Sequence, residues 1–157
     1  MTTSPDKDFG LQWHKARLND EVYSKCVNIR HTVFQAEQNV PIEIEIDNED
    51  VAHHFLVTDK DGEGVATARF RYTSEGYKCE RCAVMKNHRG LGVGLFLIKN
   101  LVKEIIAFRE DSQEPIFTHG QTHALGFWKK LGFVEHGDIF VEAGIEHYHM
   151  IFDETGY

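Results

Sequence analysis

One glycine-rich stretch stands out in the chain, Val84-Met85-Lys86-Asn87-His88-Arg89-Gly90-Leu91-Gly92-Val93-Gly94, and it joins a predicted strand to a predicted amphipathic helix. Its glycines occupy every second position, so the backbone can approach a ligand closely and leave amide groups uncovered. The N-terminus of the helix adds about half a positive charge, and Arg89 adds a full one. Residues 89–94, which we call the glycine turn, are therefore typical of a site for phosphate or pyrophosphate.

Two better-known nucleotide loops fit this stretch less well. A Walker A loop needs a lysine and a hydroxyl residue after its last glycine, but Leu95 follows Gly94. A dinucleotide fingerprint needs the spacing G-x-G-x-x-G and an acid at the end of the next strand. Here the spacing is G-x-G-x-G, and Glu114 precedes its strand. Glycines that serve packing alone are the remaining alternative, although packing does not account for the arginine.

The segments around the glycine turn follow the periods of regular structure. Apolar spacing predicts helices at about residues 19–40, 95–110 and 124–131, strands at 54–58, 64–73, 77–85, 115–118, 133–141 and 147–152, and an extended, acidic-faced piece at 42–47. This order predicts an α+β (mixed α/β) fold whose central sheet is mixed, mostly antiparallel and flanked by helices. With 157 residues and no linker-like tract, the chain is expected to form a single domain, residues 1–157.

Charge is distributed unevenly along the chain. The formal net charge is -8, which argues against nonspecific nucleic-acid binding because phosphates require a basic surface. Residues 37–63 carry nine acidic side chains and one basic one, Lys60. Residues 64–100 carry seven basic side chains and two acidic ones. The segment that contains the glycine turn is therefore locally basic, as an anionic ligand requires.

Neither a membrane segment nor a metal site is predicted. The sequence has no run of about 18 apolar residues, and residues 1–9 lack the apolar core of a signal peptide, so we expect a cytoplasmic protein without a membrane partner. An odd number of cysteines, three, favours reduced thiols. Cys79 and Cys82 form a lone CxxC on a predicted strand, where positions three apart point to opposite faces, so we expect no metal there.

The glycine turn resembles a family signature. Arg89-Gly90-Leu91-Gly92-Val93-Gly94 matches the R/Q-x-x-G-x-G/A acetyl-CoA motif of the GNAT N-acetyltransferase superfamily, and Cys82-Ala83-Val84 precede it as the expected strand. Residues 30–34, 47–50, 131–133 and 144–147 make the chain similar to the small bacterial ElaA-type branch, and the resemblance covers about residues 25–152. It implies a GNAT-like acyl-CoA N-acyltransferase fold, in which two strands splay apart and admit the cofactor.

The resemblance implies an N-acetyltransferase that moves the acetyl group of acetyl-CoA, its co-substrate, to a primary amine of a small molecule or peptide by direct attack. The amides of residues 89–94 are expected to hold the pyrophosphate, and Ala83 and Val84 to pair with the pantetheine arm. A homodimer through the late strands is compatible with this family. The implied cofactor-binding residues are Cys82, Ala83, Val84, Arg89, Gly90, Leu91, Gly92, Val93, Gly94, Gln121, Phe127 and Trp128.

Two residues are candidates for the catalytic base that must take a proton from the amine. Glu80 is predicted to share a strand face with Cys82 and Val84, next to the expected position of the thioester. The alternative for Glu80 is a strand residue held in salt bridges. His119, at the end of the short strand, is the second candidate because imidazole groups exchange protons near neutral pH.

Two further features leave the function open. Trp128 stands where the family often has a tyrosine acid, and an indole N–H donates hydrogen bonds without being a useful acid. The alternative function is therefore an acyl-CoA-binding regulatory module with little or no transferase activity. We also expect Glu45, Asp47 and Asp50 to border the acceptor side and attract a cationic amine; a solvated acidic loop, or a docking face for a partner protein, is the alternative.

Overall fold

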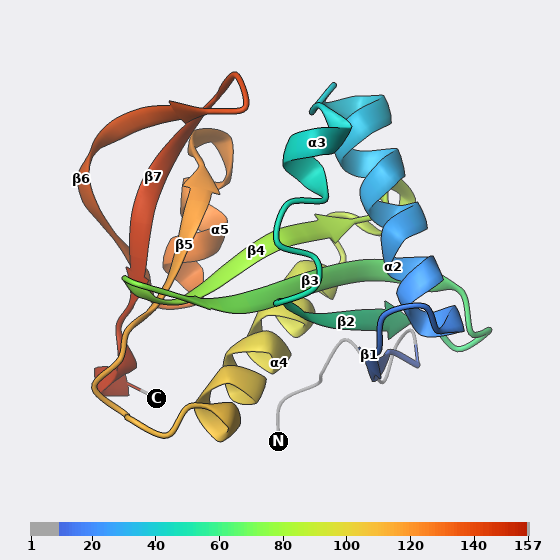
Figure 1. Cartoon of the computed structure of the whole chain (residues 1–157), viewed down its shortest axis with the longest axis horizontal. Coiled ribbons are helices and arrows are strands. Elements are labelled where there is room, and N and C mark those ends of the chain that lie inside the picture. Colours follow the sequence, from blue (N-terminus) through green and yellow to red (C-terminus); the bar gives the residue numbers. More distant parts are fainter. Residues whose placement is uncertain (1–9, 157) are drawn as a thin grey trace.

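A seven-stranded sheet in the order β1-β2-β3-β4-β5-β7-β6 runs through the protein, whose computed structural model describes residues 10–156 (Figure 1). Neighbouring strands are antiparallel except for β4 and β5, which are parallel. The predicted α+β fold with a mixed, mostly antiparallel sheet is thus confirmed. The strands are Gln12–Ala16 (β1), His53–Thr58 (β2), Gly64–Thr73 (β3), Gly76–Val84 (β4), Ile116–Gln121 (β5), Phe133–Glu142 (β6) and Ile145–Phe152 (β7).

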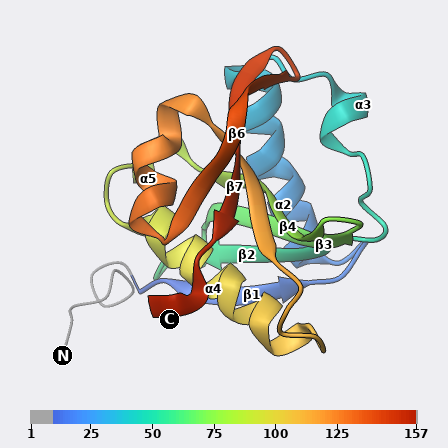
Figure 2. The ribbon, with the colours of Figure 1, turned by 90° about the vertical axis from the view of Figure 1, so that its left-hand side faces the viewer.

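Helices cover both faces of the sheet. Helix α2 (Glu21–Arg30) packs on β2 and β3, and helix α4 (Val93–Phe108) packs on the opposite face of β3 and β4 (Figure 1 and Figure 2). The Asp20 carboxylate caps α2 by accepting a hydrogen bond from the Tyr23 amide at 2.7 Å. Helix α4 buries one apolar stripe against the sheet, made of Val93, Leu97, Ile98, Leu101, Val102 and Ile105.

Shorter helical segments complete the fold. They are a π-helical continuation of α2 at His31–Glu37 (η1), helices Ile42–Glu45 (α3) and Leu125–Lys130 (α5), and 3₁₀ turns at Lys86–His88 (η2), Thr122–Ala124 (η3) and Glu154–Gly156 (η4). Among the described residues, no helix combines the length and the apolar character needed to cross a membrane.

Strands β4 and β5 remain paired over a short distance only. Beyond Cys79 and Thr118 they diverge, and β5 leaves with β7 and β6 in a direction different from that of β4 (Figure 1). We call this separation the fork. Backbone groups on the inner edges of the fork have no strand partner among the described residues, so those without another hydrogen bond are available to a ligand. The paired residues are Tyr77 with Ile116, Lys78 with Phe117 and Cys79 with Thr118.

A β-bulge in β4 lies at the fork. The register between β3 and β4 shifts between Thr67 and Arg69, and Arg81 adopts a φ of 52°. An extra residue in one strand reverses the alternation of the side chains that follow it. Cys79 and Cys82 consequently contact the same core, on the α4 face, so the prediction that they point to opposite faces is wrong.

Two segments differ from the sequence-based prediction. Strand β1 was not predicted, because its five residues show no clean apolar alternation and its pairing with β2 defines it. Residues 42–45 form helix α3 instead of an extended piece, with the Glu45 amide donating to the Pro41 carbonyl at 3.1 Å. Apolar residues at every second position over so few residues are compatible with a strand or with a single helical turn. The tertiary contacts of Glu45 decide in favour of the helix.

Candidate active site

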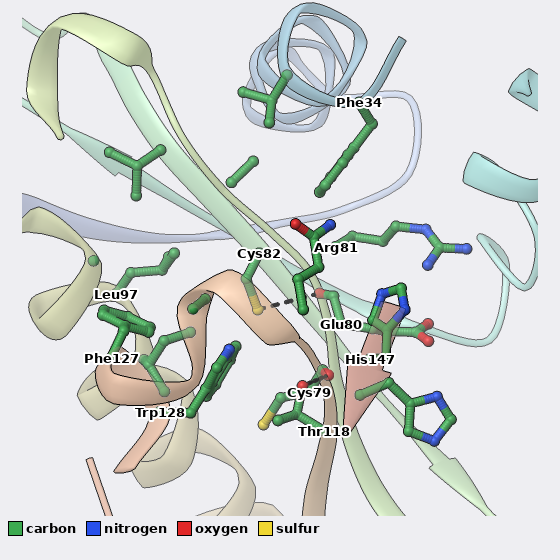
Figure 3. Close-up of a pocket in the computed structure, with 18 of the residues that line it drawn as sticks. Phe34, Cys79, Glu80, Arg81, Cys82, Leu97, Thr118, Phe127, Trp128 and His147 are labelled. Carbon is green, nitrogen blue, oxygen red and sulfur yellow. Dashed lines mark hydrogen bonds between the residues drawn. The ribbon is translucent and has the colours of Figure 1, made fainter. Parts of the chain in front are cut away.

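A cavity of about 970 Å³ opens at the fork. Phe127, Trp128 and Cys82 line it on one side, and Glu80 and His147 line it on the other (Figure 3). Two predicted site residues are not in its wall, since Leu91 is exposed and Val93 is buried in the core. The predicted residues that do line it are Glu80, Cys82, Ala83, Val84, Arg89, Gly90, Gly92, Gly94, His119, Gln121, Phe127 and Trp128.

The glycine turn leaves open space and uncapped amides beside the cavity. Gly90 and Gly92 have φ angles of 77° and 85°, a region that other residues seldom adopt. A Cβ atom on Gly90 would meet nothing within 4 Å. Gly92 is the N-cap residue of α4 and has no side chain to cap it, so among the described residues the first N–H groups of the helix lack a side-chain cap. Gly94 serves packing, because a Cβ there would lie 2.9 Å from Phe127 Cε1.

Arg89 is held beside the turn by two contacts. Its Nε donates a hydrogen bond to the Val84 carbonyl at 2.9 Å, and its Nη1 lies 2.9 Å from Glu37 Oε1 in η1. The side chains of Arg89 and Glu37 are 41% and 31% exposed. Such an exposed ion pair contributes about 1 kcal/mol or less, so a stronger anion can replace Glu37 as the partner of Arg89.

The side of the cavity next to α5 is apolar and closely packed. Trp128 is buried and lies on β5 where Gly120 leaves room for it: a Cβ on Gly120 would come within 2.9 Å of Trp128 Cδ1. Phe127 packs edge-on against Trp128, with ring centroids 5.3 Å apart. Figure 3 shows the indole nitrogen of Trp128 directed toward Cys82. The wall therefore presents one N–H group among apolar surfaces.

Cys82 contributes a neutral thiol to this wall. Burial is the main cause that raises the pKa of Cys82, to about 12. Its Sγ lies 3.7 Å from the Glu80 carbonyl oxygen, to which it donates a weak hydrogen bond. Because the thiolate is the nucleophilic form of cysteine, Cys82 is poorly suited to attack a thioester at neutral pH.

Glu80 lies on the α2 face, not on the face of Cys82 and Val84 as predicted. The bulge at Arg81 is the reason, because it reverses the alternation between these residues. Glu80 Oε2 accepts hydrogen bonds from Arg69 Nε at 2.7 Å and Arg71 Nε at 2.9 Å.

The environment of Glu80 favours its ionised form. Burial alone would raise the pKa of this carboxyl group, but the positive charges of Arg69, Arg81, Lys78 and Arg71 outweigh burial and lower it. A carboxylate stabilised by several cations is a weak base. The geometry accordingly matches the alternative given for Glu80, a strand residue held in salt bridges.

The acidic segment does not present its carboxylates to the cavity as a group. Glu45 is buried and its Oε2 accepts a hydrogen bond from Arg30 Nε at 2.6 Å. Glu49 forms ion pairs with Arg30 and with a second arginine, Arg69. Asp50 is exposed and lies outside the cavity wall, whereas Asp47 lines it. The expectation that all three predicted acids border the cavity therefore fails for Glu45 and Asp50.

His119 is oriented by a carboxylate from another strand. Its Nδ1 donates a hydrogen bond to Glu142 Oε2 at 3.3 Å, and Phe140 stands edge-on to the imidazole with ring centroids 4.9 Å apart. This hydrogen bond is the main cause that lowers the pKa of Glu142, to about 2. With the proton on Nδ1, the Nε2 atom of His119 carries a lone pair. His119 thus has the form of a base in the cavity wall.

Several polar side chains of the wall were not predicted from the sequence, among them Arg71, Lys78 and Glu142. Arg71 and Lys78 belong to the segment recognised as locally basic, so charge distribution was the available signal. Glu142 gave no local signal, because it reaches His119 only through the pairing of β5, β7 and β6. We define the polar half of the cavity by the side chains on this face of the sheet: Arg71, Lys78, Glu80, His119, Glu142 and His147.

The residues present fit the predicted cofactor. The glycine turn offers open space, uncapped amides and the cation of Arg89, and within residues 10–156 no strand pairs with the β4 edge beyond Cys79 on the side of the fork. An extended acyl-CoA arm needs such an edge and such an anion site. Across residues 10–156, no cluster of three or more His, Cys, Asp or Glu side chains is arranged to hold a metal ion.

Comparison with known proteins gives consistent matches. The family model described as "Acetyltransferase (GNAT) domain" matches residues 18–153. The uncharacterized N-acetyltransferase YjcF of Bacillus subtilis (strain 168) is 38% identical over 138 residues, which cover 86% of this chain and 95% of YjcF. The crystal structure of Escherichia coli ElaA is similar with a TM-score of 0.79 and 26% identity, over 91% of this chain and 99% of ElaA. An acyl-CoA N-acyltransferase from Pseudomonas aeruginosa gives a TM-score of 0.74 and 25% identity, over 91% and 99% of the two chains.

Proposed function

Because this chain belongs to the GNAT acetyltransferase family, we propose that it is an N-acetyltransferase that moves the acetyl group of acetyl-CoA to a primary amine of a small molecule or peptide. The GNAT family, expected from the sequence, is confirmed, and so is the resemblance of the chain to ElaA. The observation that carries the proposal is the fork between β4 and β5, which opens directly beside the glycine turn.

Binding and turnover test this function separately. Calorimetry should detect acetyl-CoA binding, and acetyl-CoA should raise the temperature of unfolding because it binds the folded state alone. Thiol release in the presence of a broad amine panel should then reveal transfer. The proposal would be refuted if acetyl-CoA at high micromolar concentration neither bound the protein nor raised its temperature of unfolding.

Different residues of the cavity bind different parts of acetyl-CoA. The glycine turn and Arg89 bind the pyrophosphate, and the backbone of Ala83 and Val84 pairs with the pantetheine arm. A backbone N–H near Val84 donates a hydrogen bond to the thioester oxygen, where negative charge develops. The cofactor supplies a thioester whose carbonyl carbon forms a C–N bond with the amine as its C–S bond breaks, so the amine loses one proton and CoA departs.

The proton of the amine goes to His119. An alkylamine with a pKa of about 10.4 is mostly protonated at neutral pH, so the site needs a proton acceptor. Nε2 of His119 accepts the proton, directly or through a water molecule, while Glu142 on Nδ1 fixes the ring and stabilises the imidazolium. Glu80 serves the same site indirectly, because it holds Arg71 and Lys78 in place.

Trp128 favours one alternative, an acyl-CoA-binding regulatory module with little or no transfer. Its indole N–H hydrogen-bonds to a departing sulfur but does not protonate it at neutral pH. A CoA-like thiol has a pKa of about 8.5, so departure as a thiolate is tolerable without an acid. Turnover that falls when His119 is replaced would exclude the regulatory module, whereas tight binding with no thiol release for any amine would support it.

Direct attack predicts that Cys82→Ala retains transferase activity. The raised pKa of Cys82 keeps its thiol neutral far above physiological pH, so no acetyl-cysteine intermediate is expected. We expect kcat to remain within about threefold of the original value, measured by thiol release. Mass spectrometry after mixing with acetyl-CoA alone should show no added acetyl group, and an acetyl group mapped to Cys82 would contradict direct attack.

Glu37→Gln should strengthen acetyl-CoA binding, because it frees Arg89 from its ion pair with Glu37. Glu37 competes with the pyrophosphate for Arg89, and an exposed pair of this kind is worth about 0.2–1 kcal/mol, so Kd should fall by a factor between about 1.4 and 5 at low salt. Glu43→Gln is the matched control, since it removes the same charge from an exposed position outside the cavity wall. Equal effects of the two changes in calorimetry would indicate a general charge effect instead.

A further inference from the structure

The ion pairs around Glu80 leave positive charge on the cavity side. Glu80 is the one carboxylate shared by Arg69, Arg71 and Lys78 within hydrogen-bond or ion-pair distance. Arg69 lies deeper, is only 1% exposed, and has Glu49 as a second partner. Its charge is therefore balanced within the protein, and the unbalanced charge belongs to the outer residues, Arg71 and Lys78.

Arg71 and Lys78 are placed together for a ligand. They are directly paired across β3 and β4, and both line the cavity. Among the described residues, the hydrogen bond of Arg71 to a carboxylate uses Nε, and its two terminal nitrogens form no hydrogen bond with a protein acceptor. Lys78 Nζ lies 3.5 Å from Glu80 Oε1, and its side chain is only 11% exposed. Partly buried cations with so few partners are costly unless a ligand supplies an anion.

The other acids of the cavity wall do not supply that anion. Glu142 has its hydrogen bond to His119, and it acts on Lys78 only at a distance beyond ion-pair contact. Asp47 is exposed, and it meets Arg69 through its backbone carbonyl oxygen at 2.5 Å instead of its carboxylate. Neither acid forms an ion pair with Arg71 among the described residues.

We propose that the acceptor is an amine that also carries a carboxylate, which Arg71 and Lys78 bind while the amine lies at the fork near His119. This inference rests on the proposed N-acetyltransferase function. An arginine edge with two free nitrogens binds a carboxylate in bidentate fashion, and the adjacent lysine adds a second charge. The same cations favour the neutral form of the amine, which is the form that attacks.

The strand registers indicate the spacing of the two groups. Lys78 pairs with Phe117 across β4 and β5, and His119 stands two residues further along β5 on the same face. Two residues of a strand span about 6.6 Å. This separation favours acceptors whose amine and carboxylate are on different carbons, as in ω-amino acids, over α-amino acids that react at their α-amine.

Matched acceptors test the proposal on the unmodified protein. The probes are ω-amino acids of increasing length, the corresponding primary amides and alkylamines, and aminoalkyl phosphonates, compared by kcat/KM for thiol release. We expect at least a tenfold preference for the carboxylate over the amide of the same length, with an optimum above the shortest chain. Calorimetry of each acceptor without acetyl-CoA gives an independent binding readout. Equal efficiency of carboxylate and amide, or a stronger preference for the phosphonate, would overturn the proposal.

Variants of Arg71 test whether this residue causes the preference for the carboxylate. Arg71→Gln should reduce the carboxylate-to-amide ratio of kcat/KM about tenfold, mainly through KM, and Arg71→Lys should restore part of it. Arg17→Gln is the control, because it removes an exposed arginine outside the cavity. An unchanged ratio in Arg71→Gln would overturn the assignment to Arg71. Absence of acetyl-CoA binding and of turnover with every amine would refute the proposed function itself, whereas turnover without a carboxylate preference refutes only this inference.

Discussion

Gly90→Glu should weaken acetyl-CoA binding at least 100-fold in calorimetry. Gly90 lines the cavity in the glycine turn, with a φ of 77° and open space where a side chain would project. A carboxylate there would occupy the proposed pyrophosphate site and repel the charges of the pyrophosphate. Two like charges about 4 Å apart cost about 4 kcal/mol at the effective dielectric of a protein surface, which is roughly three orders of magnitude in Kd before screening by salt.

A matched control separates this effect from damage to the fold. Gly62, in the turn between β2 and β3, has a φ of 81° and equally open space, but it lies outside the cavity wall. Gly62→Glu therefore introduces the same charge and the same backbone strain. The two variants should unfold at similar temperatures, and only Gly90→Glu should lose acetyl-CoA binding. Comparable loss of binding in both would show that the glycine turn is not the pyrophosphate site.

The cofactor side of the site could be predicted from the sequence, because it is formed by residues that follow one another in the chain. A strand, a run of spaced glycines and a helix N-terminus follow each other within residues 84–94, and their chemistry is backbone chemistry. The apolar stripe of α4 and the strands 64–73 and 133–141 likewise repeat a local period that a sequence displays directly.

The arrangement of the polar half could not be predicted, although Glu80 and His119 were named as candidates, because one backbone irregularity and long-range pairing determine it. The bulge at Arg81 has no sequence signal, yet it moves Glu80 to the α2 face and brings Cys79 and Cys82 to one side. The position of Glu45 depends on Arg30, fifteen residues earlier, which draws its carboxylate into the interior. Alternation along a strand predicts the faces of side chains only where the strand is regular.

The apparent conflict between an acidic protein and an anionic cofactor disappears in the folded chain. Part of the acidic segment is neutralised internally, since Glu45 and Glu49 pair with Arg30 and Arg69. The basic residues of β3 and β4 then set the charge of the cavity wall through Arg71 and Lys78. An acidic net charge is therefore compatible with anion binding on both sides of the fork, the cofactor side and the acceptor side.

His119→Ala should lower kcat about 10²- to 10⁴-fold while leaving the Kd of acetyl-CoA within about threefold, because general base catalysis contributes a factor of this size. General base catalysis predicts that the kcat/KM profile of the unmodified protein has a limb that rises with pH, and this ascending limb should disappear in the variant. Added imidazole should restore part of the rate. Retention of the limb in His119→Ala would exclude His119 as the base.

Glu142→Gln tests whether Glu142 positions His119, and the measurement is again the ascending limb of the kcat/KM profile. The hydrogen bond from His119 lowers the pKa of Glu142 to about 2, so Glu142 is ionised throughout the assay range and stabilises the imidazolium. Replacing it with a neutral amide removes that stabilisation, so the limb should shift to lower pH as kcat falls about tenfold or more. Glu142→Asp should recover part of both, since it retains the charge. His147→Asn is the control, because His147 lines the cavity but its Nδ1 hydrogen-bonds to the Ile145 carbonyl instead of Glu142. An equal shift of the limb in this variant would show that the limb does not belong to the His119–Glu142 pair alone.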